Sequence, residues 1–155
     1  MKPSEYHRVT RTCNLEGMSD GLATAIRGRM ATMGYGVDSL PQAVCCETLS
    51  VRQKRGLFGN RQEQTVAGVV LGNGWLVWAV QAGNEAPVAL SVQLSDVSVE
   101  DYETSAMSRL VTDSGIIITG MPAEVGQVGS VFLGFGQELA AREFREAIVA
   151  TKARL

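Results

Sequence analysis

The sequence predicts a mainly β (α+β) fold of antiparallel strands, closed by a C-terminal helix. Between Pro41 and Gly136, short runs of β-branched and aromatic residues alternate with turns of glycine, asparagine or aspartate. Asn73-Gly74 separates two of these runs, and this dipeptide is a strong signal for a tight hairpin. The connections are too short for the crossover helices of a parallel sheet. The last 20 residues instead follow a helical period.

Length and composition favour a single globular domain. The chain has 155 residues, 45% hydrophobic and 19% charged, with a formal net charge of −2, so we expect no nucleic-acid partner. The N-terminus lacks the apolar run of a signal peptide, and we expect a cytoplasmic protein. Cys13, Cys45 and Cys46 are odd in number and lack C-x-x-C spacing. We therefore expect reduced thiols, no metal site and no cofactor.

The first 40 residues divide into two predicted segments. Residues 1–17 show no period and are interpreted as a tail or arm. Residues 18–40 are interpreted as a short amphipathic helix and a linker. Ser19 and Asp20 are candidate N-caps, and the helix should stop at Gly34. Its apolar positions, spaced by three and four, are Leu22, Ile26, Met30 and Met33.

Residues 41–155 form the predicted main domain, with seven strands and the final helix. Neighbouring residues of a strand point to opposite faces, so one thiol of Cys45-Cys46 should be buried and the other outward. Trp75 and Trp78 should likewise lie on opposite faces, one in the core and one as an exposed platform. The predicted strands are in QAVCCETLSVRQ, QEQTVAGVVL, WLVWAVQ, APVALSVQLSDVSVEDYE, SRLVT, GIIITGM and GSVFLGFG.

The C-terminal segment GQELAAREFREAIVATKARL is predicted to be an amphipathic helix. A helix of roughly 18 residues is about 27 Å long and can lie across an open end of a small sandwich. Its apolar stripe is narrow, so we expect it to cover a rim and not to enter the core. The stripe consists of Ala140, Phe144, Ala147, Ile148 and Thr151.

This order of elements resembles the pleckstrin-homology-like (PH-like) fold, a seven-stranded bent sandwich capped by a C-terminal helix. The resemblance covers Pro41 to Leu155 and is architectural. It is carried by VVLGNGWLVWAV as the second and third strands, GIIITG and VFLGFG as the last two, and ELAAREFREAIVATK as the helix. Eukaryotic members usually have a tryptophan in this helix, whereas Phe144 fills the matching position here. PH-like domains bind phosphoinositides, phosphopeptides or proteins, so the fold alone does not decide function.

The stretch RQKRGLFGNRQ is the candidate binding site. The resemblance makes it the loop between the first two strands, where lipid-binding members hold phosphates with basic residues, and Lys54, Arg55 and Arg61 match. Gln62, Glu63 and Gln64 depart from that pattern. Leu57 and Phe58 occupy the turn and can contact a membrane, a protein partner or the domain's own core. The site residues are therefore Lys54, Arg55, Leu57, Phe58 and Arg61.

No motif in the sequence indicates catalysis. His7 is the single histidine and lies in the predicted tail, remote in sequence from a nucleophile. The acidic segment SDVSVEDYE lacks the alternating oxygen ligands of a calcium loop, and the glycine-rich runs lack P-loop spacing. We therefore expect no enzyme.

The function expected from the sequence is a non-enzymatic protein-binding or adaptor module. Its partner is a second protein or a second copy of the chain, met through the hairpin, an exposed strand edge or the N-terminal helix. The alternative is a peripheral membrane protein that binds anionic lipid through the Arg52–Arg61 hairpin.

Overall fold

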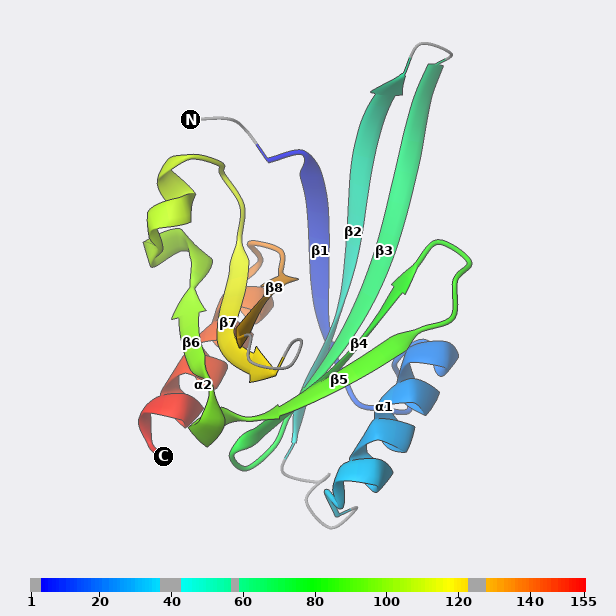
Figure 1. Ribbon diagram of the computed structural model, residues 1–155. Helices are drawn as coiled ribbons and strands as arrows, with labels where there is room; N and C mark the ends of the chain where they lie inside the picture. Colours follow the sequence, from blue (N-terminus) through cyan, green and yellow to red (C-terminus); the bar gives the residue numbers. More distant parts are fainter. Residues whose placement is uncertain (1–3, 37–42, 57–58, 123–127) are drawn as a thin grey trace.

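The structure is a computed structural model that describes residues 4–36, 43–56, 59–122 and 128–155. These residues form eight strands in two antiparallel sheets, together with two α-helices, and the strands do not close into a barrel (Figure 1). The larger sheet has the order β1-β2-β3-β4-β5, and the smaller has the order β6-β7-β8. The elements are β1 (Tyr6–Cys13), α1 (Asp20–Met33), β2 (Val44–Gly56), β3 (Gly59–Leu71), β4 (Trp75–Ala82), β5 (Val88–Gln93), β6 (Ser98–Asp101), β7 (Gly115–Pro122), β8 (Val128–Gly134) and α2 (Leu139–Ala153).

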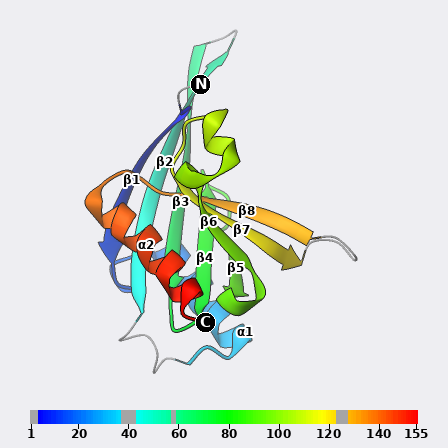
Figure 2. The same ribbon diagram turned by 90° about the vertical axis from the view of Figure 1, so that its left-hand side faces the viewer.

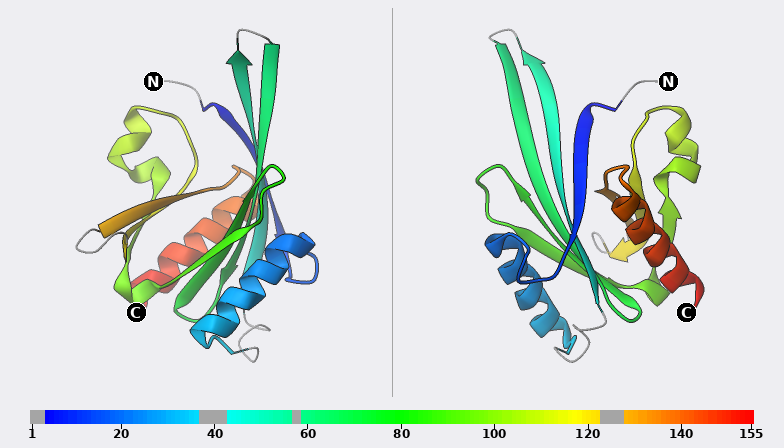
Figure 3. Two further views of the ribbon diagram at one scale, coloured as in Figure 1. Left: turned by 45° about the vertical axis from the view of Figure 1, so that its right-hand side comes forward. Right: turned by 180° about the vertical axis from the view of Figure 1, so that it is seen from behind.

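The larger sheet is covered on both faces in its lower half. Helix α1 packs on β3, β4 and β5 from one side, while α2 and the smaller sheet lie on the other (Figure 3). Figure 2 shows α2 crossing the strands, and it contacts β1, β2 and β6. Two separate apolar cores result, one on each face of the sheet. Neither α1 nor α2, the α-helices of the described residues, is long and apolar enough to cross a bilayer.

The predicted hairpin at Asn73-Gly74 is confirmed. It joins β3 to β4, with Leu71 paired to Leu76. Gly74 has φ of +88°, in the left-handed region that glycine adopts without steric strain. The turn therefore fixes the register of β3 with β4 at a point where Leu71 and Leu76 are both buried.

The predicted N-terminal helix is also confirmed, and it packs on its own sheet. Leu22, Ile26 and Met30 are buried, and the helix ends at Gly34, which has φ of +72°. Met33 is 41% exposed and lies outside the core. Ser19 is the N-cap residue, but its side chain makes no capping bond; its backbone N–H instead donates to Glu47 Oε1 at 3.0 Å.

Strand β1 differs from the tail that we expected over residues 1–17. Tyr6–Cys13 pairs with β2 along its whole length, from Tyr6 opposite Arg52 to Cys13 opposite Cys45. The segment YHRVTRTC does not alternate between apolar and polar residues as a half-buried strand usually does. Arg8 and Arg11 point to opposite sides of the strand, so both of its faces contain an arginine. The chain therefore forms an additional strand before the first strand that we predicted.

Two strand predictions between Ala86 and Thr112 were wrong. SRLVT is not a strand, because Ala106–Arg109 forms a 3₁₀ helix and Leu110 beside it is 64% exposed. The long run predicted from Ala86 is divided by a second 3₁₀ turn at Leu94–Asp96, after which β6 enters the smaller sheet. The observed count is eight strands within the described residues.

Burial is deeper than the sequence indicated. Helix α2 does more than cover a rim, because Phe144 and Ile148 are 2% and 0% exposed in the core between the sheets. Cys45 and Cys46 lie on opposite faces as predicted, yet both are buried. The same holds for the two tryptophans. The cause is the cover on both faces of the larger sheet, which leaves neither face of these strands to solvent.

Candidate binding surface

The hairpin of β2 and β3 extends beyond the rest of the larger sheet (Figure 1). Strand β1 pairs with β2 only as far as Arg52, and β4 pairs with β3 only as far as Thr65. From Gln53 opposite Gln62 to Gly56 opposite Gly59, the two strands pair with each other alone. We call residues 53–62 the basic arm, because they contain three basic residues and no acidic one.

Three of the five predicted site residues lie on described strands of the basic arm. Lys54 and Arg55 are near the end of β2, and Arg61 is near the start of β3. The register makes Lys54 the direct partner of Arg61, while Arg55 is opposite Asn60. Leu57 and Phe58 lie outside the described residues. Like charges at opposed positions destabilise an antiparallel pair, so the arm holds positive charge at an energetic cost.

Arg52, at the base of the arm, forms an ion pair with Glu5 of the same chain. Its guanidinium lies 2.5 Å from the Glu5 carboxylate and 5.6 Å from the centre of the Tyr6 ring. The hydrogen bond to Glu5 and the charge of that carboxylate raise the pKa of Arg52. Arg52 therefore joins the base of the arm to the start of β1. The basic residues within the arm are Lys54, Arg55 and Arg61.

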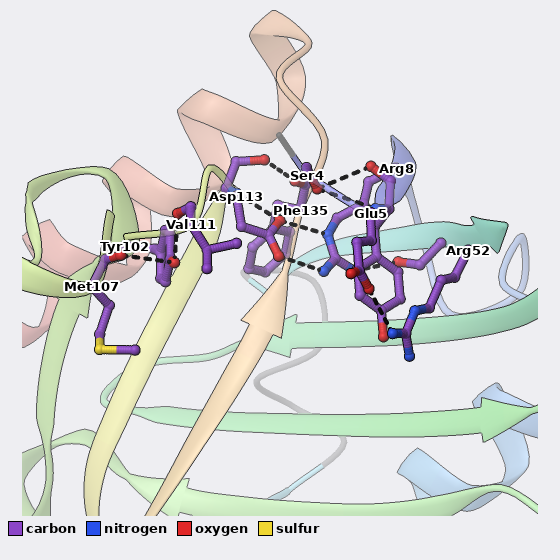
Figure 4. Close-up of polar contacts among 12 residues, drawn as sticks. Ser4, Glu5, Arg8, Arg52, Tyr102, Met107, Val111, Asp113 and Phe135 are labelled. Carbon is purple, nitrogen blue, oxygen red and sulfur yellow. Dashed lines mark hydrogen bonds and ion pairs between the residues drawn. The ribbon is translucent and has the colours of Figure 1, made fainter. Parts of the chain in front are cut away.

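Arg8 of β1 ties the two sheets together just below the arm (Figure 4). Its Nε and Nη2 donate to the two carboxylate oxygens of Asp113 at 3.1 and 2.9 Å, and its Nη1 donates to Ser50 Oγ at 2.7 Å. The guanidinium also stacks on the rings of Tyr6 and Phe132, 4.4 and 5.5 Å from their centres. Such a two-pronged pair is both strong and geometrically specific, so it fixes the distance between β1 and the smaller sheet.

Two cavities flank Arg8, and the smaller of them lies between the two sheets. The larger, of about 380 Å³, is lined by His7, Asp113 and the turn before α2. The smaller, of about 260 Å³, is lined by Ser50, Thr65 and Phe132 among others. Tyr6, Arg8 and Asp113 line both cavities. The sheets thus separate toward the arm, whereas they close on an apolar core at the other end.

The groups around the larger cavity are committed to structural hydrogen bonds. Asp113 accepts from Arg8 and from the N–H of Ser114, and the Ser114 hydroxyl donates to the carbonyl of Phe135 at 2.6 Å. His7 lines the same cavity but is exposed. A serine that donates to a carbonyl is not activated by a base. Within the described residues, no group of three or more histidine, cysteine or acidic side chains is placed to hold a metal ion.

The three cysteines are free thiols held in their protonated form. Burial raises the pKa of Cys45 to about 11 and also raises the pKa of Cys13 and of Cys46. The thiolate is the reactive species, so these side chains behave as core residues at neutral pH.

Sequence reasoning missed Arg8, Asp113 and the cavities beside them. Arg8 lay in the predicted tail, and Asp113 is 105 residues away from it in the chain. The available signal was the alternation of Tyr6, Arg8, Thr10 and Thr12 on one face of a strand. Comparisons with known protein families, with curated proteins and with solved structures found no match to this chain.

Proposed function

We propose that the chain is a PH-like, non-enzymatic binding module. Four strands, β2 to β5, share one sheet, three strands, β6 to β8, share the next, and α2 closes the space between them. The number of strands after β1, seven, and the final helix support the proposal, although β5 and β6 come from one predicted strand and SRLVT is not a strand. Arg8, Asp113 and Ser114, which line the larger cavity, are engaged in structural bonds, which supports a binding role over catalysis.

The basic arm is the proposed binding element, and its partner is an acidic protein surface. The observation that carries this proposal is the register, which opposes Lys54 to Arg61 on two strands that no third strand of the described residues supports. Acidic side chains of a partner relieve this repulsion as they bind, so the charge arrangement that weakens the free arm strengthens the complex.

The distribution of charge along the chain supports the same proposal. Residues 53–62 contain three of the 14 basic residues and no acidic residue, so the remainder holds 11 basic and 16 acidic residues. A basic arm on an acidic body orients the protein at an anionic surface, because that surface attracts the arm and repels the body. Arginine and an aromatic residue, here Phe58 in the sequence of the arm, are common in protein-binding surfaces.

Anionic lipid is the second candidate partner, supported by the projection of β2 and β3 beyond both sheets (Figure 1). Each basic residue contributes about 1 kcal/mol near an anionic membrane. In this alternative, Leu57 and Phe58 would enter the headgroup region. A membrane is an extended anionic surface that also faces the acidic body, whereas an acidic site on a protein can be confined to the arm, and this favours the protein partner.

A comparison of two charge-matched variants tests the proposal. Lys54→Gln/Arg55→Gln/Arg61→Gln removes the cations of the arm. Arg27→Gln/Arg109→Gln/Arg142→Gln removes three exposed arginines from other elements and serves as the control. Binding of labelled poly-glutamate, followed by fluorescence anisotropy, should be retained by the control and weakened by about 10- to 100-fold in the arm variant. Equal weakening in both variants would contradict a specific role for the arm.

Vesicle flotation separates the two partners. The protein should fail to float with neutral vesicles and with vesicles that contain phosphatidylserine. Salt-sensitive flotation with the anionic vesicles, lost in Phe58→Asp, would replace the protein partner by a membrane. Binding to neither poly-glutamate nor vesicles would remove the proposed function.

A further inference from the structure

The two sheets have four outer edges in the described residues, and three of them are blocked. At β1, the N–H of Thr10 donates to the Glu138 carboxylate, and α2 packs against the strand. Strand β6 carries two acidic residues and is held by Arg145 of α2. At β8, the pairing with β7 is shifted by an irregularity between Thr119 and Met121, which bends this edge.

The fourth edge, β5, lacks these protections. Its sequence, VALSVQ, has no charged residue and no proline, and β4 is its one neighbour in the sheet order of the described residues. Val88 is 63% exposed and Leu90 is 37% exposed. Folded proteins normally block a sheet edge with charges, proline or a bulge, because an apolar open edge pairs with another strand.

The backbone groups that face outward from β5 follow from the alternation of hydrogen bonds across the sheet. The N–H of Thr10 points away from β2, toward Glu138. Hydrogen-bonding direction alternates along each antiparallel strand, and the register of the five strands carries this alternation to β5. Even-numbered residues of β5 then bond to β4, so Ala89 and Ser91 direct their N–H and C=O groups outward. The bond from Gly83 N–H to the Gln64 carbonyl agrees with this assignment.

Helix α1 lies over this side of the sheet without blocking the edge. Arg29 is folded onto the sheet, where its Nε donates to Ser91 Oγ at 2.8 Å. A Cβ at Gly21 would lie 3.4 Å from Pro87, just before β5, so this flank of the helix is close to the strand. Gly21 and Ala25, on the same flank, are too small to overhang the edge.

We propose that two copies of the chain form a dimer through β5, paired antiparallel about a two-fold axis near Leu90. Self-pairing is favoured because β5 itself has no charged residue, and the nearby guanidinium of Arg29 is hydrogen-bonded to Ser91 of its own copy. A two-fold contact uses the same surface on both copies and closes the assembly at two. Pairing satisfies the open groups of Ala89 and Ser91 and places exposed Leu90 against its symmetry mate.

This inference goes beyond the proposed function, because the basic arm takes no part in the contact. The arm and β5 belong to different strands of the larger sheet, and β5 does not pair with either strand of the arm. A dimer carries two arms, so a partner with two acidic surfaces would bind with higher avidity. Loss of the dimer and loss of poly-glutamate binding are therefore separate outcomes.

Light scattering over a dilution series tests the dimer. The protein should have a mass of about twice 16.6 kDa at high concentration and should approach 16.6 kDa on dilution. Val88→Lys puts a charge on the open edge and should give the monomer mass throughout. Val9→Lys is the matched control, since Val9 is 49% exposed in the blocked edge strand β1, and it should leave the dimer unchanged. A monomeric protein at every concentration, or equal effects of the two variants, would overturn the proposal.

Disulfide trapping tests the position of the axis. Leu90 bonds to β4, so it would face its symmetry mate as a non-hydrogen-bonded pair. The Cα atoms of such a pair are about 4.5 Å apart, within the range that a disulfide spans. Leu90→Cys should therefore give a covalent dimer under mild oxidation, while Val9→Cys should remain monomeric on a non-reducing gel. The three native thiols are retained in both variants, so they contribute equally. A dimer by mass in which the Leu90→Cys variant does not cross-link would reject the assignment to β5.

Discussion

Strands β2 and β3 run through two different environments, and the contrast between them separates scaffold from binding surface. In their lower half, Cys46 and Val69 pack toward α2, while Cys45 and Val70 pack toward α1, and all four are buried. In the basic arm, the same two strands have neither a third strand nor a covering helix among the described residues. A two-stranded ribbon alone is marginally stable, so the buried half must hold the arm in place.

The difference shows that continuous pairing does not imply uniform stability. Apolar burial stabilises the lower half, at about 25 cal/mol for each Å² removed from water. The arm has no third strand beside it among the described residues and opposes two basic residues in its register, which favours interaction with a partner over internal stability. Changes in the lower half should therefore affect folding, and changes in the arm should affect binding.

The largest expected effect is at Trp78, which is 2% exposed between the sheets. Trp78→Ala should destabilise the protein by about 3–5 kcal/mol, because it leaves a large cavity in the core. Gln62→Ala, in the arm, should change the free energy of unfolding by less than about 0.5 kcal/mol. Urea unfolding followed by circular dichroism measures both. Similar losses in the two variants would break the contrast between the two halves.

The next effect concerns the Arg8–Asp113 pair at the boundary between the halves. The side chains are 11% and 15% exposed, so Asp113→Ala leaves a mostly buried guanidinium without its carboxylate. We expect a loss of about 3 kcal/mol in the free energy of unfolding. Arg8→Met/Asp113→Leu, which replaces both charges by apolar groups, should recover part of that loss. A double variant less stable than Asp113→Ala would show that the pair itself is a main source of stability.

A smaller, pH-dependent effect is expected at Glu47, in the buried half. Burial of its carboxylate opposes ionisation, but hydrogen bonds from Ser19 and Arg11 outweigh it and lower the pKa of Glu47 below the ordinary value of 4.5. A lowered pKa stabilises the folded state above the unfolded pKa, and this contribution is lost as pH falls through the folded pKa. At pH 7, Glu47→Gln should therefore be about 1–2 kcal/mol less stable than the wild type.

The pH profile provides the control for that prediction. The difference in stability between Glu47→Gln and the wild type should narrow below about pH 4, as the wild-type carboxylate takes up a proton. Thermal unfolding from about pH 3 to about pH 8 measures this difference. A constant difference over this range would show that the stabilisation does not depend on the charge of Glu47.

The smallest effect on stability is expected from the charges of the arm. Lys54→Gln/Arg55→Gln/Arg61→Gln removes the opposed cations, so the free energy of unfolding should be unchanged or should rise by about 0.5 kcal/mol or less. Urea unfolding of this variant and of the Arg27→Gln/Arg109→Gln/Arg142→Gln control makes the comparison. A loss above about 1 kcal/mol in the arm variant alone would mean that the arm stabilises the fold.

The sequence predicted the elements that depend on local signals. Asn73-Gly74 specified a hairpin, and the spacing of Leu22, Ile26 and Met30 specified α1. The sequence did not predict where both faces of a strand are covered. The pattern of Cys45-Cys46 and of the two tryptophans fits a sheet that is covered on one face as well as a sheet that is covered on both. Strand β1 and the Arg8–Asp113 pair depend on contacts between residues far apart in the chain. The charge of the arm was visible in the sequence, but the opposition of Lys54 to Arg61 required the register.

Hydrogen exchange of backbone amides tests the contrast between the two halves most directly. The amides of Lys54 and Arg61, which are paired across the arm, should exchange much faster than those of Val69 and Trp78, because no third strand or helix of the described residues protects the arm. Addition of poly-glutamate should slow exchange in the arm and leave the buried strands unchanged. Equal protection of the arm and the buried strands in the free protein, or an arm that does not respond to poly-glutamate, would contradict the separation of scaffold from binding surface.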